Sequence, residues 1–369
     1  MTEAASPHVQ IIGSNDTRIW GMPHPERIRR IAAKAGMEIG RTGDPGPALI
    51  VNVDYAFDPQ WFEFMRDRLG SVLTIDGAPA IANVTTRAAE AASAMAEGRI
   101  PAGLEEVRAE DHRNFYNKAL RKIEWPFLVR LTPAAVPGIE RRAYYGAYKG
   151  VTDLLTKYLW PEWALFLTRI AARVGLTPNM VTGIGFVFNV LAFVAFWEGR
   201  YWLGMGLGLV FMVLDTVDGK LARCTITSTG WGEVLDHGID LIHPPFWWWA
   251  WGVGLSSVGL ALPPATFALI MALLVAGYVV QRLIEGVFIK RYGMDIHVWG
   301  RIDSQFRLIT ARRNPNMVIL FGSMLFGRPD IGLILITAWT VVSCIFHAVR
   351  LVQADQDSRK GRQIVSWMG

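Results

Sequence analysis

Long uncharged apolar segments occupy the second half of the chain, and residues 1–150 contain no stretch able to span a bilayer. Residues 174–197 lack Asp, Glu, Lys and Arg over 24 positions, and residues 241–281 are uncharged over 41 positions. Since a helix needs roughly 20 apolar residues to cross a membrane, the first segment predicts one span and the second predicts two, joined at about 252–264. Three further spans are predicted at 201–215, 314–327 and 331–349. The pattern therefore predicts six transmembrane helices.

Shorter periodic segments in the first 140 residues predict a small α/β domain. Residues 48–57 and 71–77 are rich in β-branched residues and end at Asp, Gly or Pro, which is typical of strands. Residues 25–36 and 60–70 have helical spacing with Gly at their ends. Alternating elements favour a partial nucleotide-fold sheet, but its Gly-rich phosphate loop is missing from the sequence. The predicted fold is mainly α, a six-helix transmembrane bundle preceded by a small cytoplasmic α/β domain.

Four parts follow from these patterns. They are an α/β domain over 1–140, an interfacial amphipathic region over 141–175, the transmembrane domain over 176–352 and a basic tail over 353–369. In the amphipathic region we expect Trp160 and Trp163 to anchor a helix at the membrane surface. The alternative is a soluble helix packed on its own domain.

Composition supports a membrane protein. The chain is 51% hydrophobic and 19% charged, with a mean hydropathy of +0.26, which excludes disorder and is too apolar for an ordinary soluble protein. The net charge of +5 suits anionic lipid head groups, and we expect membrane lipid and no nucleic acid as partner. Cys224 and Cys344 cannot form a disulfide framework. The first ten residues lack the basic and apolar regions of a signal peptide.

Basic residues gather on one side of the predicted bundle. The segment between the fourth and fifth helices is crowded with Lys and Arg, whereas the opposite side offers only Arg200 and Arg328. Because basic loops stay on the cytoplasmic side, both termini and the N-terminal domain are predicted to be cytoplasmic. We therefore expect a multi-pass protein of the inner cell membrane.

Residues 214–240 carry the chemistry, with the spacing D-x2-D-G-x2-A-R-x8-G-x3-D-x3-D. The four acids form two pairs, each on one helix face, and both pairs lie at the cytoplasmic membrane edge. Carboxylates converging there repel one another unless divalent cations bind between them, and oxygen ligands without His or Cys favour Mg²⁺ or Mn²⁺. The eight fixed residues are Asp215, Asp218, Gly219, Ala222, Arg223, Gly232, Asp236 and Asp240.

Other residues of this stretch complete a phosphoryl-transfer site. Gly219 and Gly232 remove side chains where a ligand or another backbone comes close. Arg223 and Lys220 supply positive charge for phosphate. Metal, phosphate and a spare carboxylate base together describe phosphoryl-group transfer. Two alternatives remain: acids that merely flank a loop, or a cation transporter or scaffold that uses them as an ion site.

The stretch resembles, position for position, the signature of the CDP-alcohol phosphotransferase (CDP-alcohol phosphatidyltransferase) family, and the resemblance covers roughly residues 150–350. It implies six transmembrane helices, commonly a homodimer, and a divalent-metal site at the cytoplasmic end. By that likeness Asp215, Asp218 and Asp236 are metal ligands, and Asp240 is a metal neighbour and the catalytic base. Gly219, Ala222 and Arg223 line the cytidine diphosphate site by the same likeness. Two metal ions then neutralise the diphosphate.

The reaction implied is transfer of a phospho-alcohol from a CDP-linked donor to an acceptor hydroxyl, with release of CMP. The favoured version combines CDP-diacylglycerol with a polar alcohol such as inositol phosphate or glycerol phosphate, and the alternative transfers a head group from a donor such as CDP-inositol to a lipid hydroxyl. Fusions to a cytidylyltransferase-like domain exist in the family, and residues 1–140 resemble a degenerate form of it. We expect a regulatory or docking module rather than a second active site.

Smaller features point to the substrates. Thr182 follows Thr177 and Pro178 at the start of the first span, and this entrance resembles the family's nucleotide side, with simple helix capping as the alternative. Asn314 before the fifth helix is expected to act as a cap. For an anionic acceptor, the predicted ligands are Arg282, Arg312 and Arg313, with pairing of Arg282 to Glu285 and the positive-inside rule as the alternatives.

Overall fold

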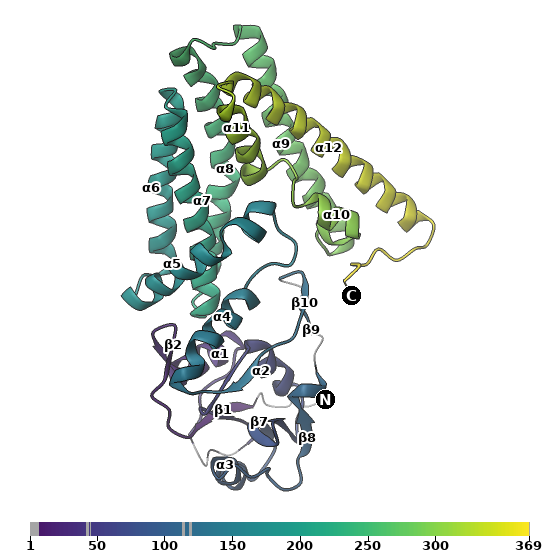
Figure 1. The fold of residues 1–369 in the computed structure, drawn as a ribbon. Coiled ribbons are helices and arrows are strands. Elements are labelled where there is room, and N and C mark those ends of the chain that lie inside the picture. The colour runs from purple at the N-terminus through teal and green to yellow at the C-terminus, as the bar shows by residue number, and fades with distance from the viewer. Residues whose placement is uncertain (1–6, 42–43, 45, 113–114, 118–119, 369) are drawn as a thin grey trace.

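The computed structural model describes residues 7–41, 44, 46–112, 115–117 and 120–368, and leaves out the side chains at 233 and 235–237 within a helix. An α/β domain lies at one end of a helical bundle, with two shorter helices between them (Figure 1). The strands are β1 His8–Ile12, β2 Arg18–Ile19, β3 Met22–Pro23, β4 Ala48–Asn52, β5 Tyr55–Phe57, β6 Ser71–Ile75, β7 Ala78–Val84, β8 Glu105–Arg108, β9 Phe115–Asn117, β10 Lys122–Glu124 and β11 Leu128–Arg130.

Helices make up most of the remaining chain. The α-helices are α1 His24–Lys34, α2 Pro59–Arg66, α3 Ala88–Ala96, α4 Val136–Gly146, α5 Pro161–Val174, α6 Pro178–Trp197, α7 Tyr201–Cys224, α8 Gly230–Gly254, α9 Pro264–Tyr292, α10 Arg301–Phe306, α11 Arg313–Leu325 and α12 Pro329–Arg359. Shorter turns are η1 Ala109–Asp111, η2 Pro133–Ala135, the π-helical η3 Leu155–Leu159, η4 Leu255–Val258 and η5 Ile296–Val298.

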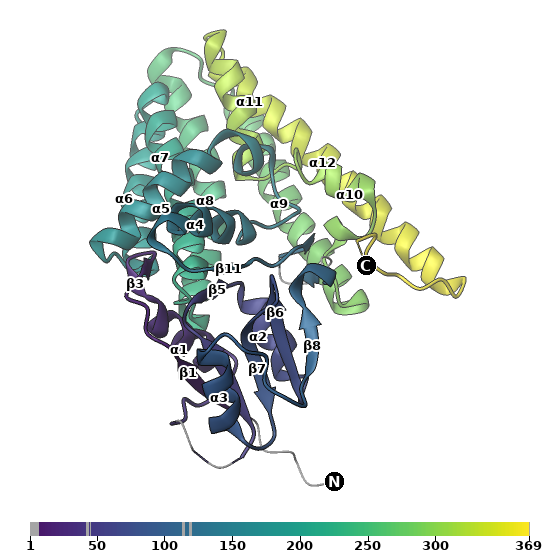
Figure 2. The ribbon, with the colours of Figure 1, turned by 60° about the horizontal axis from the view of Figure 1, so that its bottom comes forward.

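The N-terminal sheet has the strand order β1-β4-β7-β6-β8, with parallel pairs at both edges and antiparallel pairs inside. Alternate residues of β4 serve two cores: Leu49 and Val51 face the cluster that holds α1 and α2, and Ala48 and Ile50 face the cluster that holds α3. Helices therefore cover both faces of the sheet (Figure 2). The α/β prediction is confirmed here, and the predicted strands at 48–57 and 71–77 correspond to β4, β5 and β6.

A helix stands at each of the six predicted spans, namely α6, α7, α8, α9, α11 and α12. Within the described residues, four of them (α6, α7, α9 and α12) are long and apolar enough to cross a membrane. Helix α11 is short, with 13 residues. The motif stretch includes the end of α7 and the start of α8. Four candidate spans are therefore established by length and composition, and the count of six remains a prediction.

One buried hydrophobic cluster includes residues of both the bundle and the α/β domain. Ile19 and Trp20 of the N-terminal domain belong to the same buried cluster as residues of α4, α5 and α7. Trp160, expected as a membrane anchor, is fully buried in this cluster and donates a hydrogen bond from Nε1 to Oγ1 of Thr216. The anchor assignment was wrong for Trp160, because its neighbours in α7 enclose it. Trp163, in contrast, is 55% exposed.

Candidate active site

The motif joins the end of α7 to the start of α8. Helix α7 is apolar up to Leu214 and then carries Asp215 and Asp218 on its last turns. Helix α8 begins at Gly230, capped by Oγ1 of Thr229, which accepts a hydrogen bond from the Gly232 amide at 3.1 Å. Because a short loop joins the two helices, Asp215 and Asp240, which are 25 positions apart in the sequence, line the same cavity.

Asp215 and Asp240 share a single cation. The Arg313 guanidinium donates from Nη2 to Oδ2 of Asp215 at 2.7 Å and from Nη1 to Oδ1 of Asp240 at 2.7 Å. The Asp215 side chain is 16% exposed and that of Asp240 is 43% exposed. The last acid of the motif is thus the more accessible of the two. This is the geometry of two carboxylates converging on one positive charge.

Asp218 contacts Thr182, the residue that the sequence predicts to lie near the nucleotide. Oγ1 of Thr182 donates to Oδ2 of Asp218 at 2.6 Å, so α6 contacts α7 at the motif. Thr177 caps α6 by accepting from the Met180 amide. The capping interpretation is confirmed by Thr177, and the nucleotide-side role of Thr182, which contacts the motif, stays a prediction.

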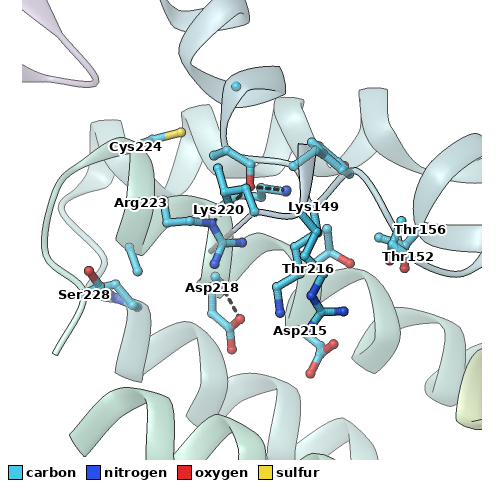
Figure 3. A pocket seen from close by; sticks show the side chains of 18 of the residues that line it. Lys149, Thr152, Thr156, Asp215, Thr216, Asp218, Lys220, Arg223, Cys224 and Ser228 are labelled. Atoms are coloured by element: carbon cyan, nitrogen blue, oxygen red, sulfur yellow. Dashed lines mark hydrogen bonds between the residues drawn. The ribbon is translucent and has the colours of Figure 1, made fainter. Parts of the chain in front are cut away.

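The small motif residues make room for their neighbours. A Cβ on Gly219 would lie 3.1 Å from a guanidinium nitrogen of Arg223, and one on Gly232 would lie 3.0 Å from Oδ1 of Asn179. Lys220 donates to the Ala147 carbonyl at 2.9 Å, and Nε of Arg223 donates to the same oxygen at 3.1 Å. Figure 3 shows Asp215, Asp218, Lys220 and Arg223 around one space.

A cavity of about 1050 Å³ joins these groups. Its wall includes residues of the bundle and of the N-terminal domain. Of the residues predicted as ligands or catalysts, those on the cavity wall are Thr182, Asp215, Asp218, Gly219, Lys220, Ala222, Arg223, Asp240, Arg282, Arg312 and Arg313. The side chain of Asp236 lies outside the described part of the chain, and its predicted role as a ligand is not placed.

The donor set fits a divalent cation in its chemistry. Within the described side chains, which omit Asp236, no group of three or more His, Cys, Asp or Glu is arranged to hold a metal ion. Asp215 and Asp240 nevertheless converge on one cationic group, and Asp218 lines the same cavity. Carboxylate oxygens are the ligands that Mg²⁺ and Mn²⁺ prefer. These acids are therefore the residues that would hold such an ion.

A second set of charged residues lines the same cavity. Arg282 and Arg312 both donate to Glu285, at 3.2 and 2.6 Å. The expected alternative for Arg282, pairing with Glu285, is thus present in the structure. Even so, Nε of Arg282 and Nε of Arg312 are buried without a hydrogen-bond partner among the described residues.

Arg307 belongs to this set and was not predicted as a site residue from the sequence. It is one of several basic residues between the fourth and fifth predicted spans. Its Nε and Nη1 atoms are buried without a hydrogen-bond partner among the described residues. Burial, assisted by the nearby Arg312, lowers the pKa of Arg307 to about 9. A guanidinium held this way gains from an anionic ligand, because buried unpaired donors are costly.

Asp153 and Asn314 form a further polar contact that the sequence did not reveal. Asn314 donates from Nδ2 to Oδ1 of Asp153 at 3.1 Å, and Asp153 also accepts from Oγ1 of Thr156 at 2.8 Å. The expected capping by Asn314 was wrong: no side chain caps α11, since the Asn314 amide is turned to Asp153 instead. This contact attaches the segment before α5 to the start of α11.

The fold and site define a membrane-embedded helical domain with a carboxylate motif at one end. Residues 175–346 match the family described as CDP-alcohol phosphatidyltransferase. The helical domain of this chain thus matches the family that the sequence resembles.

Individual relatives match shorter segments. Cholinephosphotransferase 1 of Gallus gallus is 33% identical over 136 residues, which are 33% of this chain and 38% of that protein. Phosphatidylinositol phosphate synthase of Mycolicibacterium smegmatis is 30% identical over 135 residues, which are 35% of this chain and 60% of that protein. The chain thus spans less than two thirds of either relative.

One solved structure is similar in part. It is the crystal structure of Mycobacterium tuberculosis phosphatidylinositol phosphate synthase (PgsA1) with CDP-DAG bound, at a TM-score of 0.40 and 20% identity. The likeness covers 51% of this chain and 92% of that one.

Proposed function

We propose that this chain is an integral membrane transferase of phospholipid synthesis. It transfers a phosphatidyl group from CDP-diacylglycerol to the hydroxyl of a phosphorylated polar alcohol, such as inositol phosphate or glycerol phosphate, and releases CMP. The observation that carries the proposal is one cavity lined by three motif carboxylates and by arginines with buried nitrogens that have no hydrogen-bond partner among the described residues. The family of the helical domain and the relative named for phosphatidylinositol phosphate synthesis support the same choice.

The donor and the acceptor occupy opposite walls of the cavity. Thr182, Gly219, Lys220, Ala222 and Arg223 form the donor side, where positive charge meets the diphosphate. On the acceptor side, Arg282, Arg307 and Arg312 bind the acceptor phosphate; Arg307 joins the earlier set because of its unpartnered nitrogens. Arg313 lies between the two walls, bound to Asp215 and Asp240.

Asp240 acts as the base. The acceptor hydroxyl gives its proton to the Asp240 carboxylate, while its oxygen bonds to the phosphorus that carries the diacylglycerol. The bond from that phosphorus to the CMP oxygen breaks, and CMP leaves with the bonding electrons. Asp215, Asp218, Asp236 and Asp240 would hold two Mg²⁺ or Mn²⁺ ions. Such ions supply charge neutralisation of the diphosphate when bound.

The membrane arrangement is part of the proposal. All six helices α6, α7, α8, α9, α11 and α12 cross the inner membrane, and the motif and the N-terminal domain face the cytoplasm. Four of the helices meet the length and hydropathy of a span, and the basic residues between α9 and α11 favour this orientation. We further propose that the protein acts as a homodimer, as the family resemblance implies.

Purified protein in liposomes tests the reaction. With CDP-diacylglycerol and Mg²⁺, we expect CMP release that depends on inositol phosphate or glycerol phosphate and yields a phosphorylated phospholipid. Inositol and serine are the control acceptors, because both have a hydroxyl but lack the phosphate, and they should react poorly. Equal rates with these acceptors that lack a phosphate would contradict the acceptor assignment.

The second candidate uses the opposite pairing of substrates. Transfer of a phospho-head group from a CDP-alcohol to a lipid hydroxyl is favoured by the similarity to cholinephosphotransferase 1. CDP-inositol or CDP-choline with diacylglycerol or a ceramide-type lipid, in the same liposomes, tests this version. A cation transporter or scaffold would release no CMP under either condition.

A further inference from the structure

Helix α1 of the N-terminal domain contacts the loop that joins the two halves of the motif. Nη1 of Arg27 donates to the Cys224 carbonyl at 2.8 Å, and Nη1 of Arg30 donates to the Thr225 carbonyl at 3.1 Å. One turn further along α1, Lys34 donates to Oγ of Ser228 at 2.9 Å. Positions 27, 30 and 34 share one helix face, so α1 presents a row of cations to this loop.

The contact lies at the C-terminal end of α7, where carbonyl groups lack helical partners and carry negative partial charge. Arg27 is buried, with 2% of its surface exposed. A buried guanidinium that donates to a helix-end carbonyl holds that carbonyl firmly, because either group alone would be left unsatisfied. The N-terminal domain therefore supplies the C-terminal cap of the helix that carries Asp215 and Asp218.

Ile226, in the same loop, has a strained backbone. Its φ angle is +55°, a left-handed conformation that β-branched residues rarely adopt. The side chain packs against the N-terminal core cluster that includes Ile28 and Ile31 of α1. Strain of this kind persists only where the surroundings impose it. The domain thus holds the loop in a shape that the sequence of the loop itself disfavours.

The shape of this loop decides how the two halves of the motif meet. Arg223 is the second-last residue of α7, just before the loop, and Thr229 ends the loop by capping α8. At the start of α8, Gly232 approaches Asn179 of α6 so closely that a Cβ would lie 3.0 Å from the Asn179 amide oxygen. A change of loop shape would therefore shift α8 relative to Arg223 and α6.

The N-terminal domain also contributes to a second part of the cavity wall. Arg121, in the turn between β9 and β10, forms an ion pair with Asp295 at 2.9 Å, next to η5. The amide of Gly150 donates to the Leu120 carbonyl at 2.8 Å. The domain is thus attached on both sides of the cavity, at the motif loop and at the segment that follows α9.

We propose that the N-terminal α/β domain is a positioning element of the transfer site. Helix α1 and the packing around Ile226 hold the α7–α8 loop so that Arg223 of α7 and Asp240 of α8 face the donor. Arg27, Arg30 and Ile226 are positioning residues that act through the loop. The role of Arg223 toward the donor rests on the proposed function, whereas the restraint on the loop does not.

The full-length protein in lipid nanodiscs tests both parts. Arg27→Met removes the buried contact, and Arg29→Met is the matched control, because Arg29 is on the same helix with 54% of its side chain exposed. Amide hydrogen exchange of residues 222–232 should rise about tenfold or more in Arg27→Met and stay unchanged in the control. The donor KM should rise about fivefold or more while the acceptor KM changes less than about twofold. Arg27→Lys, which keeps the charge, should recover part of both effects.

Ile226→Gly is the second variant, since glycine adopts the left-handed backbone easily and only the packed side chain is lost. It should fold and should reproduce the faster exchange and the higher donor KM. Exchange as slow as in the wild type in both Arg27→Met and Ile226→Gly would overturn the proposal. If the wild type releases no CMP at all, the exchange measurement alone still decides the positioning role, and the proposed reaction fails separately.

Discussion

The guanidinium of Arg313, at the start of α11, lies 2.7 Å from the carboxylate of Asp215 on α7, and 98 positions of sequence separate the two residues. Its other terminal nitrogen binds Asp240 at the same distance. One arginine therefore supplies positive charge between two acids that we propose as metal ligands. This arrangement connects the proposed acceptor wall to the motif. It also means that the arginine and a divalent ion compete for the same carboxylate oxygens.

Arg313→Gln should strengthen metal binding while turnover falls. The arginine occupies oxygen atoms that a divalent ion would use, so its removal frees both carboxylates. We expect the Mn²⁺ dissociation constant, measured by electron paramagnetic resonance on the purified protein, to fall about tenfold. Arg328→Gln, which removes an arginine paired to Asp330 at the far end of the bundle, is the control. A weaker or unchanged Mn²⁺ affinity in Arg313→Gln would count against the metal site.

Asp240→Asn should abolish turnover and leave donor binding largely intact. The side chain keeps its size but cannot take the acceptor proton. Asp215→Asn and Asp218→Asn should instead lose metal and donor together, since these acids lie deeper, on the donor side. CMP release and equilibrium binding of CDP-diacylglycerol distinguish the two outcomes. A rate of about a tenth of wild type or more in Asp240→Asn, at saturating Mg²⁺, would show that another group is the base.

Arg307→Ala should raise the acceptor KM about tenfold or more with the donor KM near wild type, because a charge-assisted bond to phosphate is lost. Arg282→Ala and Arg312→Ala should act in the same direction. The exposed Arg301 of α10 provides the control variant, Arg301→Ala. Initial rates over a matrix of both substrates measure the two KM values. An equal rise in both would indicate misfolding rather than loss of an acceptor ligand.

The N-terminal domain should not make a CDP-alcohol by itself. The sequence lacks a Gly-rich phosphate loop, so nothing is expected to hold the triphosphate of CTP. Deleting residues 1–140 should lower expression or activity without eliminating the CMP-forming transfer, because the motif acids lie in the bundle. Incubation of the full chain with CTP and an alcohol phosphate, followed by chromatography, checks the first statement. Formation of a CDP-alcohol would show a second active site.

His24 should make the stability of the N-terminal domain sensitive to acid. The imidazole is fully buried, with Nε2 at 2.8 Å from the Tyr55 carbonyl, and burial lowers its pKa from 6.5 to about 4. Between pH 6.5 and pH 4, His24 is therefore protonated in the unfolded chain and neutral in the folded domain. Stability contributed by neutral His24 is complete above pH 6.5 and is lost as the pH falls toward 4, by about 3 kcal/mol in all.

His24→Gln checks this assignment, because the amide can still donate to the Tyr55 carbonyl but does not titrate in this range. Melting temperatures between pH 7 and pH 4 should fall more steeply for the wild type than for the variant. Parallel curves for the two proteins would mean that other groups cause the acid sensitivity.

The sequence alone determined the parts of the protein that depend on local patterns. Uncharged segments of sufficient length located the helices of the bundle, because a bilayer tolerates few charges, and β-branched runs located β4 and β6. The eight-residue motif predicted the candidate site, since its spacing places each pair of acids on one helix face. The same residues carry the resemblance to the family that residues 175–346 match.

Contacts between distant segments were decided only by the tertiary structure. No local pattern distinguishes Arg307, whose Nε and Nη1 are buried without a hydrogen-bond partner in the described part of the chain, from the exposed Arg301 nearby. Trp160 has the spacing of a membrane anchor, yet α7 encloses it. The docking of Arg27 on Cys224 joins residues 197 positions apart and depends on the whole N-terminal domain being folded. Burial and partnership are properties of the packed molecule, and a linear sequence specifies them only through the complete set of contacts.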